Sequence, residues 1–598
     1  MDSLLIPNGL NGATGDYLLD PQSPRQITAV ARQEQKEDIK KLEAVRGLQE
    51  GVDPKQLAQA GWGVIFAYAE RDRLDEIKEA LAPLLTLRQE QAGERYREYA
   101  GLDAFRPGQS AQDFRARFGL GYGPVNPSKM PYYLLIVADP RALPFEVQYQ
   151  LAVQHAVGRI CFDSLDAYNS YAQSVVAAET GRIARPKQAT FFGVHNPDDR
   201  ATELSATQLI QPLSAWVEQD QPKWQIQTIP PASAQKAQLI RHLGGDRTAA
   251  LFFGASHGIG FPLGDSRQRP HQGALVCQDW PGEANWQAPI PQDFYLAGDD
   301  IGDDAQVAGM IAYFYACYGA GMPQEDYFGS TGNGPVQIAE YPFLAQLPQR
   351  LLAHPRGGAL AVVGHVERTW STSFLWDGKP QLETFQSTLK RLMEGHPLGS
   401  AHEYFGLRHA ELASVLSQKL ELARIDRLYK MFADDYHYAV APLWTAHHDA
   451  RSYIIIGDPA VRLAVSDTAS ALKAQPAIIV QTPVAFSTPV DAGSAAVAPV
   501  HPQSSPRFQS DVLKGESRLT ITTYVVDSIV GETSRSEAAR TVISADGTIE
   551  TIVAVDHAQN WPLLTLHGDT IRGAAAQGWA VNIALPDAMS VLRDGASR

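Results

Sequence analysis

The stretch GMIAYFYACYGAGMP, residues 309–323, indicates a buried strand that ends in a cysteine. Apolar residues follow one another without a break from Ile311 to Cys317, as in a strand of a parallel sheet that is covered on both faces. Gly319 and Gly321 then break the strand. Cys317 has two interpretations at this point: a small apolar residue that fills the core, or a nucleophile at the carboxyl edge of a sheet.

Strands and helices of the same kind alternate around this stretch. Continuous apolar strands are predicted at 188–194, 224–229, 248–258, 358–366 and 452–459, and amphipathic helices lie between them, including 383–394 and 402–430. This alternation is typical of a parallel sheet with helices on both faces. We therefore predict an α/β domain over residues 185–466, with a mostly parallel sheet of about six strands flanked by helices.

The flanking regions differ in composition from this domain. Residues 1–128 are predicted to be mainly helical, with helical spacing at 24–49 and 71–100 and a strand at 61–68. Residues 129–184 are expected to form a smaller α/β subdomain. Residues 467–512 are rich in Pro, Ala, Ser and Val, which is typical of a linker. Alternating β-branched residues predict a small β-rich or α+β module over 513–598.

The overall composition excludes several classes of protein. The chain has 598 residues, of which 44% are hydrophobic and 20% charged, and its net charge of −15 argues against binding to nucleic acid or to an anionic membrane. The first residues lack the pattern of a secretory signal, and no stretch reaches the ~20 apolar residues of a membrane span. Three cysteines suit neither a disulfide framework nor a zinc site, so we predict a cytoplasmic protein without metal or cofactor.

A histidine follows the preceding core strand in the same way as Cys317 follows its own. His257 ends the stretch TAALFFGASHG, residues 248–258, and is followed by Gly258. A lone histidine here could equally be structural. If the two strands are neighbours in the sheet, however, His257 and Cys317 emerge side by side, and an imidazole can accept the proton of a thiol. The backbone N–H groups of Gly258 and Cys317 are then candidates for stabilising an oxyanion.

These two strand ends together resemble the gingipain-like branch of the caspase clan of cysteine peptidases. The stretches GGALAVVGHVERTW (357–370) and SYIIIGDPAVRL (452–463) also resemble segments of that branch. The resemblance covers about residues 130–465 and implies a caspase–hemoglobinase-like fold. It further implies Cys317 as nucleophile, His257 as proton-transfer partner, and the amides of Gly258 and Cys317 as the oxyanion hole.

Two loops are candidates for the pocket that selects the residue before the scissile bond. Asp198, Asp199 and Glu367 would favour Arg or Lys there, whereas Arg200 and Arg368 in the same loops would favour an acidic residue. We expect a basic residue, because two aspartates are adjacent and the protein is acidic. Trp370 is either a wall of this pocket or ordinary packing. Of the other cysteines, Cys161 is expected to lie in the core and Cys277 on a hairpin near the mouth of the site.

The sequence therefore predicts a cysteine endopeptidase that acts through a thioester on a protein or peptide substrate. Two alternatives remain open: an inactive scaffold with the same fold, and a hydrolase of a non-peptide amide or thioester. Regions on both sides of the predicted catalytic domain suggest regulation, either by a protein partner of the N-terminal helices or C-terminal module, or by self-cleavage in the linker.

Overall fold

The computed structural model describes two separate parts of the chain. The described residues are 4–27, 47–329, 335–429, 436–466, 507–514, 518–529, 532–544 and 549–553. Contacts within the chain divide it into Met1–Pro483 and Val484–Arg598. None of the described helices is both long and apolar enough to cross a membrane.

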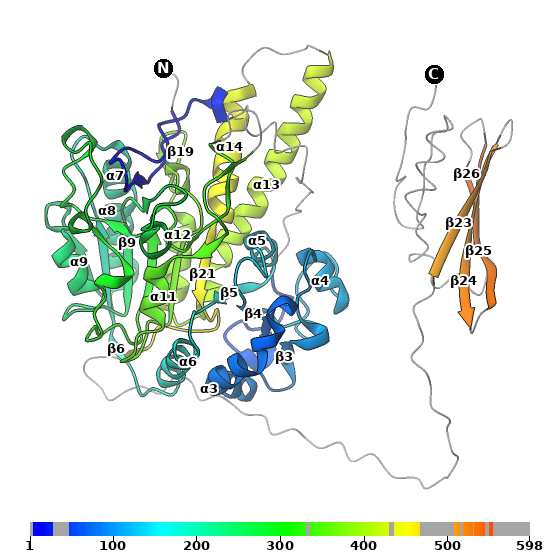
Figure 1. Cartoon of the computed structure of the whole chain (residues 1–598), viewed down its shortest axis with the longest axis horizontal. Helices are drawn as coiled ribbons and strands as arrows, with labels where there is room; N and C mark the ends of the chain where they lie inside the picture. Colours follow the sequence, from blue (N-terminus) through cyan, green and yellow to red (C-terminus); the bar gives the residue numbers. More distant parts are fainter. Residues whose placement is uncertain are drawn as a thin grey trace, which may run out of the picture. The chain divides into compact units, whose positions relative to one another are not determined.

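The first part is built around one ten-stranded sheet, which is flanked by helices (Figure 1). In spatial order its strands are β3 (Tyr96–Tyr99), β2 (Trp62–Phe66), β4 (Tyr133–Val137), β5 (Ala156–Ile160), β21 (Tyr453–Gly457), β18 (Ala361–His365), β13 (Ile311–Tyr315), β9 (Leu251–Ala255), β7 (Gln188–Gly193) and β8 (Gln225–Ile229). The central strands are fully buried, which is why their sequences are continuously apolar rather than alternating.

The sheet consists of two half-sheets that run in opposite directions. β18 and β21 pair antiparallel, and the other pairings described in this sheet are parallel. The strands β8, β7, β9, β13 and β18 therefore end at one edge, and β21, β5, β4, β2 and β3 end at the opposite edge. Ligands of such sheets bind at the carboxyl ends of strands, so each edge is a separate place for a site.

The helices follow the strands as the alternating pattern predicts. The helices of the first part are α2 (Leu57–Ala60), α3 (Leu74–Ala92), α4 (Ala111–Arg117), α5 (Phe145–Ala152), α6 (Leu165–Glu179), α7 (Arg200–Leu204), α8 (Gln211–Asp220), α9 (Lys236–His242), α10 (Gln268–His271), α11 (Gln346–Leu352), α12 (Glu383–Met393), α13 (Leu398–Tyr429) and α14 (Tyr436–Arg451). α3 packs against α6, and α12 packs against both α8 and α13.

The predicted domain of about six strands is found within a larger sheet. Six of the ten strands lie between residues 185 and 466, as expected, and the other four come from residues 62–160. The sheet thus runs across the predicted boundaries at 128 and 184. The helix predicted over 71–100 was wrong at its end, because Tyr96–Tyr99 forms the edge strand β3. Most of the helix predicted over 24–49 lies outside the described residues.

The second part contains a four-stranded antiparallel sheet. Its strands are β23 (Arg507–Lys514), β24 (Arg518–Ile529), β25 (Glu532–Ser544) and β26 (Ile549–Val553), paired in chain order. β23 begins inside the predicted linker, and residues 467–506 of that linker lie outside the described residues. The β-branched stretch predicted to be a strand corresponds to β24.

Candidate functional site

Cys317 and His257 follow adjacent strands of the same half-sheet. β13 pairs in parallel with β9, so that Tyr315 lies opposite Ala255. Cys317 and His257 each come two residues after this pair, as the sequence predicted for neighbouring strands. β7 lies on the other side of β9 with Gly193 opposite Ala255, so the loop after β7 reaches the same edge.

The backbone around Cys317 is tightly packed and locally strained. A Cβ atom on Gly258 would lie 1.8 Å from the carbonyl oxygen of Cys317, so only glycine allows the two strand ends to approach this closely. Tyr318 has a φ of 57°, which is a left-handed conformation that non-glycine residues rarely adopt. Such strain persists where the surrounding structure enforces it, and it often marks functional sites.

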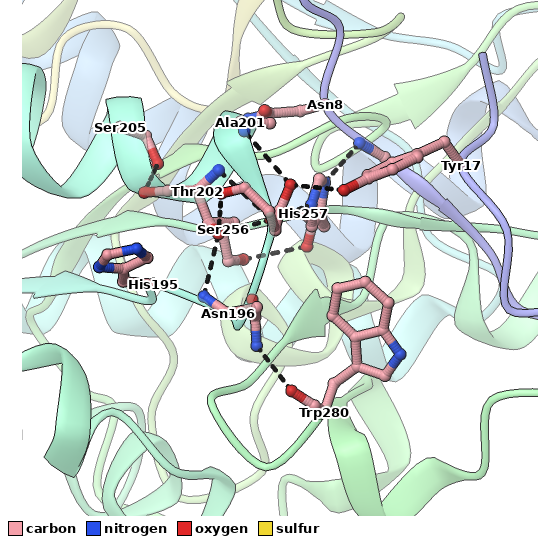
Figure 2. Close-up of polar contacts among 12 residues, drawn as sticks. Asn8, Tyr17, His195, Asn196, Ala201, Thr202, Ser205, Ser256, His257 and Trp280 are labelled. Atoms are coloured by element: carbon pink, nitrogen blue, oxygen red, sulfur yellow. Dashed lines mark hydrogen bonds and ion pairs between the residues drawn. The ribbon is translucent and has the colours of Figure 1, made fainter. Parts of the chain in front are cut away.

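His257 is fully buried and is held by an aspartate at the start of a helix. Its Nε2 lies 2.7 Å from Oδ2 of Asp199, which is the N-cap residue of α7 (Figure 2). Asp199 also accepts hydrogen bonds from the hydroxyl groups of Thr202 and Tyr17. Burial alone would raise the pKa of Asp199, but the nearby His257 and these hydrogen bonds hold it below its usual value. An ionised Asp199 fixes the ring and keeps the proton on Nε2, which leaves Nδ1 as an acceptor.

Cys317 is also fully buried, and its thiol is a hydrogen-bond donor. Its Sγ donates to the carbonyl oxygen of Asn8 at 2.7 Å and accepts from the backbone N–H of Thr369 at 3.2 Å. Burial raises the pKa of the Cys317 thiol to about 11, although the hydrogen bonds from Thr369 favour the thiolate. In this covered state the side chain is therefore protonated near neutral pH.

Residues 5–22 form a hairpin that covers this pair. Leu5 bridges Gln22 and Leu10 bridges Tyr17, both in antiparallel fashion, with a turn between them. Figure 1 shows the hairpin as the dark blue segment beside α7. We call residues 5–22 the covering hairpin.

One peptide bond of the covering hairpin lies between the thiol and the imidazole. The carbonyl oxygen of Asn8 accepts from Cys317, and the N–H of Gly9 donates to Nδ1 of His257 at 2.7 Å. The two functional side chains are thus bridged by the Asn8–Gly9 peptide group. The hydrogen bond of Tyr17 to Asp199, at 2.8 Å, adds a further contact between the hairpin and the site (Figure 2).

The two amides predicted to stabilise an oxyanion have no other partner. Within the described residues, neither the N–H of Gly258 nor that of Cys317 donates a hydrogen bond. The neighbouring groups are engaged, since the carbonyl of Gly258 accepts from Leu10 and the N–H of Tyr318 donates to the carbonyl of Glu367. Free amides next to a nucleophile are what an oxyanion requires.

The predicted pocket residues occupy different places. Asp198 is exposed, and Asp199 is committed to His257. Glu367 lies 3.3 Å from Arg451, and Trp370 is buried against Phe328.

The two arginines that would favour an acidic residue are also paired. The guanidinium of Arg368 lies 2.7 Å from the carboxylate of Asp326, and both side chains are buried. Arg200 lies 2.8 Å from Glu203 on the surface. Asp199 was thus singled out from the sequence as a pocket residue, whereas in the structure it contacts His257.

The other cysteines are not next to an imidazole–carboxylate pair. Cys277 is buried in the insertion after His257, where its thiol donates weakly to the carbonyl of Leu275, and burial raises its pKa well above the usual range. Cys161 follows β5, whose carboxyl end is at the opposite edge of the sheet. Among the described residues no group of three or more His, Cys, Asp or Glu side chains is arranged to hold a metal ion.

Comparisons with known protein families and with curated proteins give no match. Two solved structures are similar at 11% identity. One, described as "Structure of Protease", has a TM-score of 0.37, with 83% of this chain and 91% of that chain covered. The other, the complex of Porphyromonas gingivalis RgpB pro- and mature domains, has a TM-score of 0.38, with 82% of this chain and 99% of that chain covered. Similarity at this level is too distant to assign a function to the chain.

Proposed function

We propose that the protein is a cysteine peptidase in which Cys317 attacks a peptide carbonyl and His257 transfers the proton. The observation that carries this proposal is the triad-like order of Cys317, a peptide group, His257 and Asp199 along one sheet edge. A thiol, an imidazole and an orienting carboxylate form the arrangement that activates a nucleophile. Fold resemblance alone would not support it.

Each group has a defined task in this proposal. His257 accepts the thiol proton at Nδ1, because Nε2 is already engaged with Asp199. Sγ attacks the carbonyl carbon, and the amides of Gly258 and Cys317 stabilise the oxyanion. The imidazolium then protonates the leaving amine, and water hydrolyses the thioester. Asp199 stabilises the imidazolium throughout.

The alternatives differ from this proposal in specific ways. A scaffold would need neither unpartnered amides beside Cys317 nor a buried carboxylate on the histidine. A hydrolase of a small amide or thioester would use the same residues, but the covering hairpin contacts the site through backbone hydrogen bonds, as a peptide does. The expected preference for Arg or Lys receives no support, since Asp199 and Glu367 are paired with His257 and Arg451.

A variant that opens the site allows a direct test. Gly9 has a φ of 111°, and a Cβ there would lie 2.8 Å from Leu18 and 3.1 Å from Sγ of Cys317, so Gly9→Ala should displace the hairpin. In this background we expect a peptide library to be cut and a thiol-directed inhibitor to label Cys317.

Both activities should be lost in Gly9→Ala/Cys317→Ala and strongly reduced in Gly9→Ala/His257→Ala. Gly9→Ala/Cys277→Ala is the matched control and should behave like the parent. Peptide hydrolysis that persists without Cys317 would refute the assignment, and labelling of Cys317 that is independent of His257 would favour the scaffold.

A further inference from the structure

We propose that the first substrate of this site is the Asn8–Gly9 peptide bond of its own covering hairpin, and that the site selects an uncharged residue before the scissile bond. This proposal rests on the proposed function and goes beyond it in naming the bond and the residue preference. It differs from cleavage in the 467–512 linker, because the hairpin lies in the site.

The covering hairpin is bound as an added strand on both sides of that bond. Before the bond, Pro7 bridges Trp370 in antiparallel fashion, and the N–H of Asn8 donates to the carbonyl of Thr369 at 3.0 Å. The N–H of Ser371 donates to the carbonyl of Ile6 at 3.3 Å. These backbone hydrogen bonds fix the register of the segment before it reaches Cys317.

After the bond, the segment pairs with the other wall of the site. β1 (Leu10–Asn11) runs parallel to β10 (Ile259–Gly260), and the N–H of Gly12 donates to the carbonyl of Gly260 at 2.7 Å. The two walls are thus residues 369–371 and 258–260, one on each side of the dyad. Among the residues that the structure describes, the Asn8–Gly9 peptide group is the one that hydrogen-bonds to both Cys317 and His257.

The cleavage step begins with a rotation of the bound peptide group. Its oxygen leaves the thiol for the amides of Gly258 and Cys317, and its N–H leaves Nδ1 of His257. The thiol proton then moves to Nδ1, and Sγ forms a bond to the carbonyl carbon of Asn8. The C–N bond breaks as Nδ1 delivers this proton to the nitrogen of Gly9. Water cleaves the thioester, which frees Cys317 and leaves the piece that ends at Asn8 as a carboxylic acid.

Side chains on both sides of the bond define the substrate class. Leu5 packs in an apolar cluster with Trp370 and Phe328, and Leu10 packs in another with Ile259 and Trp280. A suitable substrate therefore has an apolar residue three positions before the asparagine and another two positions after it. Glycine must follow the asparagine, since Gly9 has a φ of 111° and a Cβ there would lie 3.1 Å from Sγ of Cys317.

The residue before the bond is buried and uncharged. Asn8 is 3% exposed, and its side-chain amide nitrogen has no hydrogen-bond partner among the described residues. Two acidic side chains of the surrounding loops, Asp326 and Glu367, are already paired with arginines. A charged side chain in place of Asn8 would be buried without a partner, which is costly. The site therefore favours an uncharged side chain over Arg, Lys or Asp at this position.

Mass spectrometry of the full-length chain tests the cleavage. We expect the wild-type protein to convert to a species that begins at Gly9, at a rate that does not change on dilution, because the bond is cut within its own chain. Cys317→Ala should stay intact under the same conditions. A wild-type chain that keeps the Asn8–Gly9 bond after prolonged incubation would overturn the proposal.

Variants at residue 8 test the preference. Asn8→Gln should still be cut, whereas Asn8→Asp and Asn8→Arg should be cut at least about 100-fold more slowly, since each buries an unpaired charge. Ala13→Arg, on the partly exposed turn of the hairpin, is the matched control for added charge and should be cut like wild type. Faster cleavage of Asn8→Arg would overturn the preference for an uncharged side chain.

The Gly9→Ala variant separates this proposal from the proposed function. Alanine disfavours the left-handed backbone conformation of residue 9, and this should increase the fraction of molecules with an exposed Cys317 roughly tenfold. A thiol-directed inhibitor should therefore react faster with this variant, while the bond after Asn8 stays intact. If Gly9→Ala cuts added peptides but the wild-type chain never cuts itself, the inference fails and the peptidase stands. If no variant cuts any peptide, both fail.

Discussion

Two buried carboxylates, one in each half-sheet, show how the same kind of interaction can serve different purposes. Asp199 pairs with His257 at the carboxyl edge of β9, and Asp458 pairs with Arg88 beside β2, with Nε of Arg88 2.7 Å from the carboxylate. Asp458 also accepts from the indole N–H of Trp62 at 2.9 Å.

The difference lies in the cation. The guanidinium of Arg88 does not lose its proton, so its pair with Asp458 joins α3 to the sheet and has no chemistry of its own. The imidazole of His257 can gain and lose a proton, and its second nitrogen faces a peptide bond. A buried ion pair can become reactive when its cation can release a proton and its second nitrogen faces a peptide group.

Replacing Asp199 should have the largest effect, and it should be an effect on rate. In Asp199→Asn the imidazolium loses its counter-charge and the ring can adopt the wrong tautomer, which costs about 10⁴-fold in turnover for comparable groups. Asparagine still caps α7, so the melting temperature should change little. Self-cleavage at Asn8 measured by mass spectrometry, with thermal unfolding as the control, checks both expectations. Unchanged cleavage would remove Asp199 from the mechanism.

Replacing Asp458 should have the opposite profile. Asp458→Asn leaves Arg88 buried with a weakened partner, and we expect a loss of about 3 kcal/mol in the free energy of unfolding. Denaturant unfolding of the Cys317→Ala background avoids interference from self-cleavage. With Cys317 present, the fraction of Asp458→Asn that is folded at low temperature should react with the thiol-directed inhibitor and cleave itself as the wild type does. A loss of catalysis in that folded fraction would contradict the comparison.

A glycine of each half-sheet sharpens the comparison further. A Cβ at Gly258 would lie 1.8 Å from the carbonyl oxygen of Cys317, and one at Gly158 would lie 2.1 Å from that of Gly457. Gly258→Ala and Gly158→Ala should each cost about 2 kcal/mol of stability through overpacking. Only Gly258→Ala should also lower the rate of self-cleavage in the folded fraction. Equal effects of both on that rate would show that the two half-sheets are not functionally distinct.

The smallest predicted effect is the pH dependence of stability from a buried histidine. His155, at the start of β5, has its pKa lowered to about 3 by burial and by the charge of Arg115. The unfolded chain therefore binds a proton below about pH 6.5 that the folded chain does not, so stability falls as pH drops. This contribution is about 1 kcal/mol between pH 6.5 and 5.5. His155→Gln should flatten that slope in thermal unfolding, whereas the exposed His195→Gln should leave it unchanged.

The sequence was sufficient to predict the strands of the half-sheet that carries the candidate site. Its strands are continuously apolar, and two of them are followed by a histidine and a cysteine. The location of His257 and Cys317 after neighbouring strands could therefore be predicted. The reversal of direction at β21 could not, because apolar patterning is the same in parallel and antiparallel buried strands. The role of Asp199 depends on β7 lying next to β9, which is a property of the folded chain.

The covering hairpin was the least predictable part of the site. Residues 7–16 are rich in Gly and Asn and show neither helical spacing nor alternation, so their pattern predicts no helix or strand. Its conformation comes from pairing with residues 258–260 and 369–371 rather than from its own propensity. The available signals were two Asn-Gly pairs, at residues 8–9 and 11–12, since Asn-Gly marks turns in most contexts.

The position of β21 also has a consequence for how the protein folds during synthesis. This strand lies between β5 and β18, so it alone joins the two half-sheets through backbone hydrogen bonds in the described chain. The strands from residues 62–160 are made early, yet their exposed edge at β5 stays unpaired until residues 453–457 leave the ribosome. Contacts this distant in sequence form slowly, and an open apolar edge favours association with other chains. The nascent protein is therefore most exposed to aggregation over the whole interval in which the half-sheet that carries His257 and Cys317 is being made.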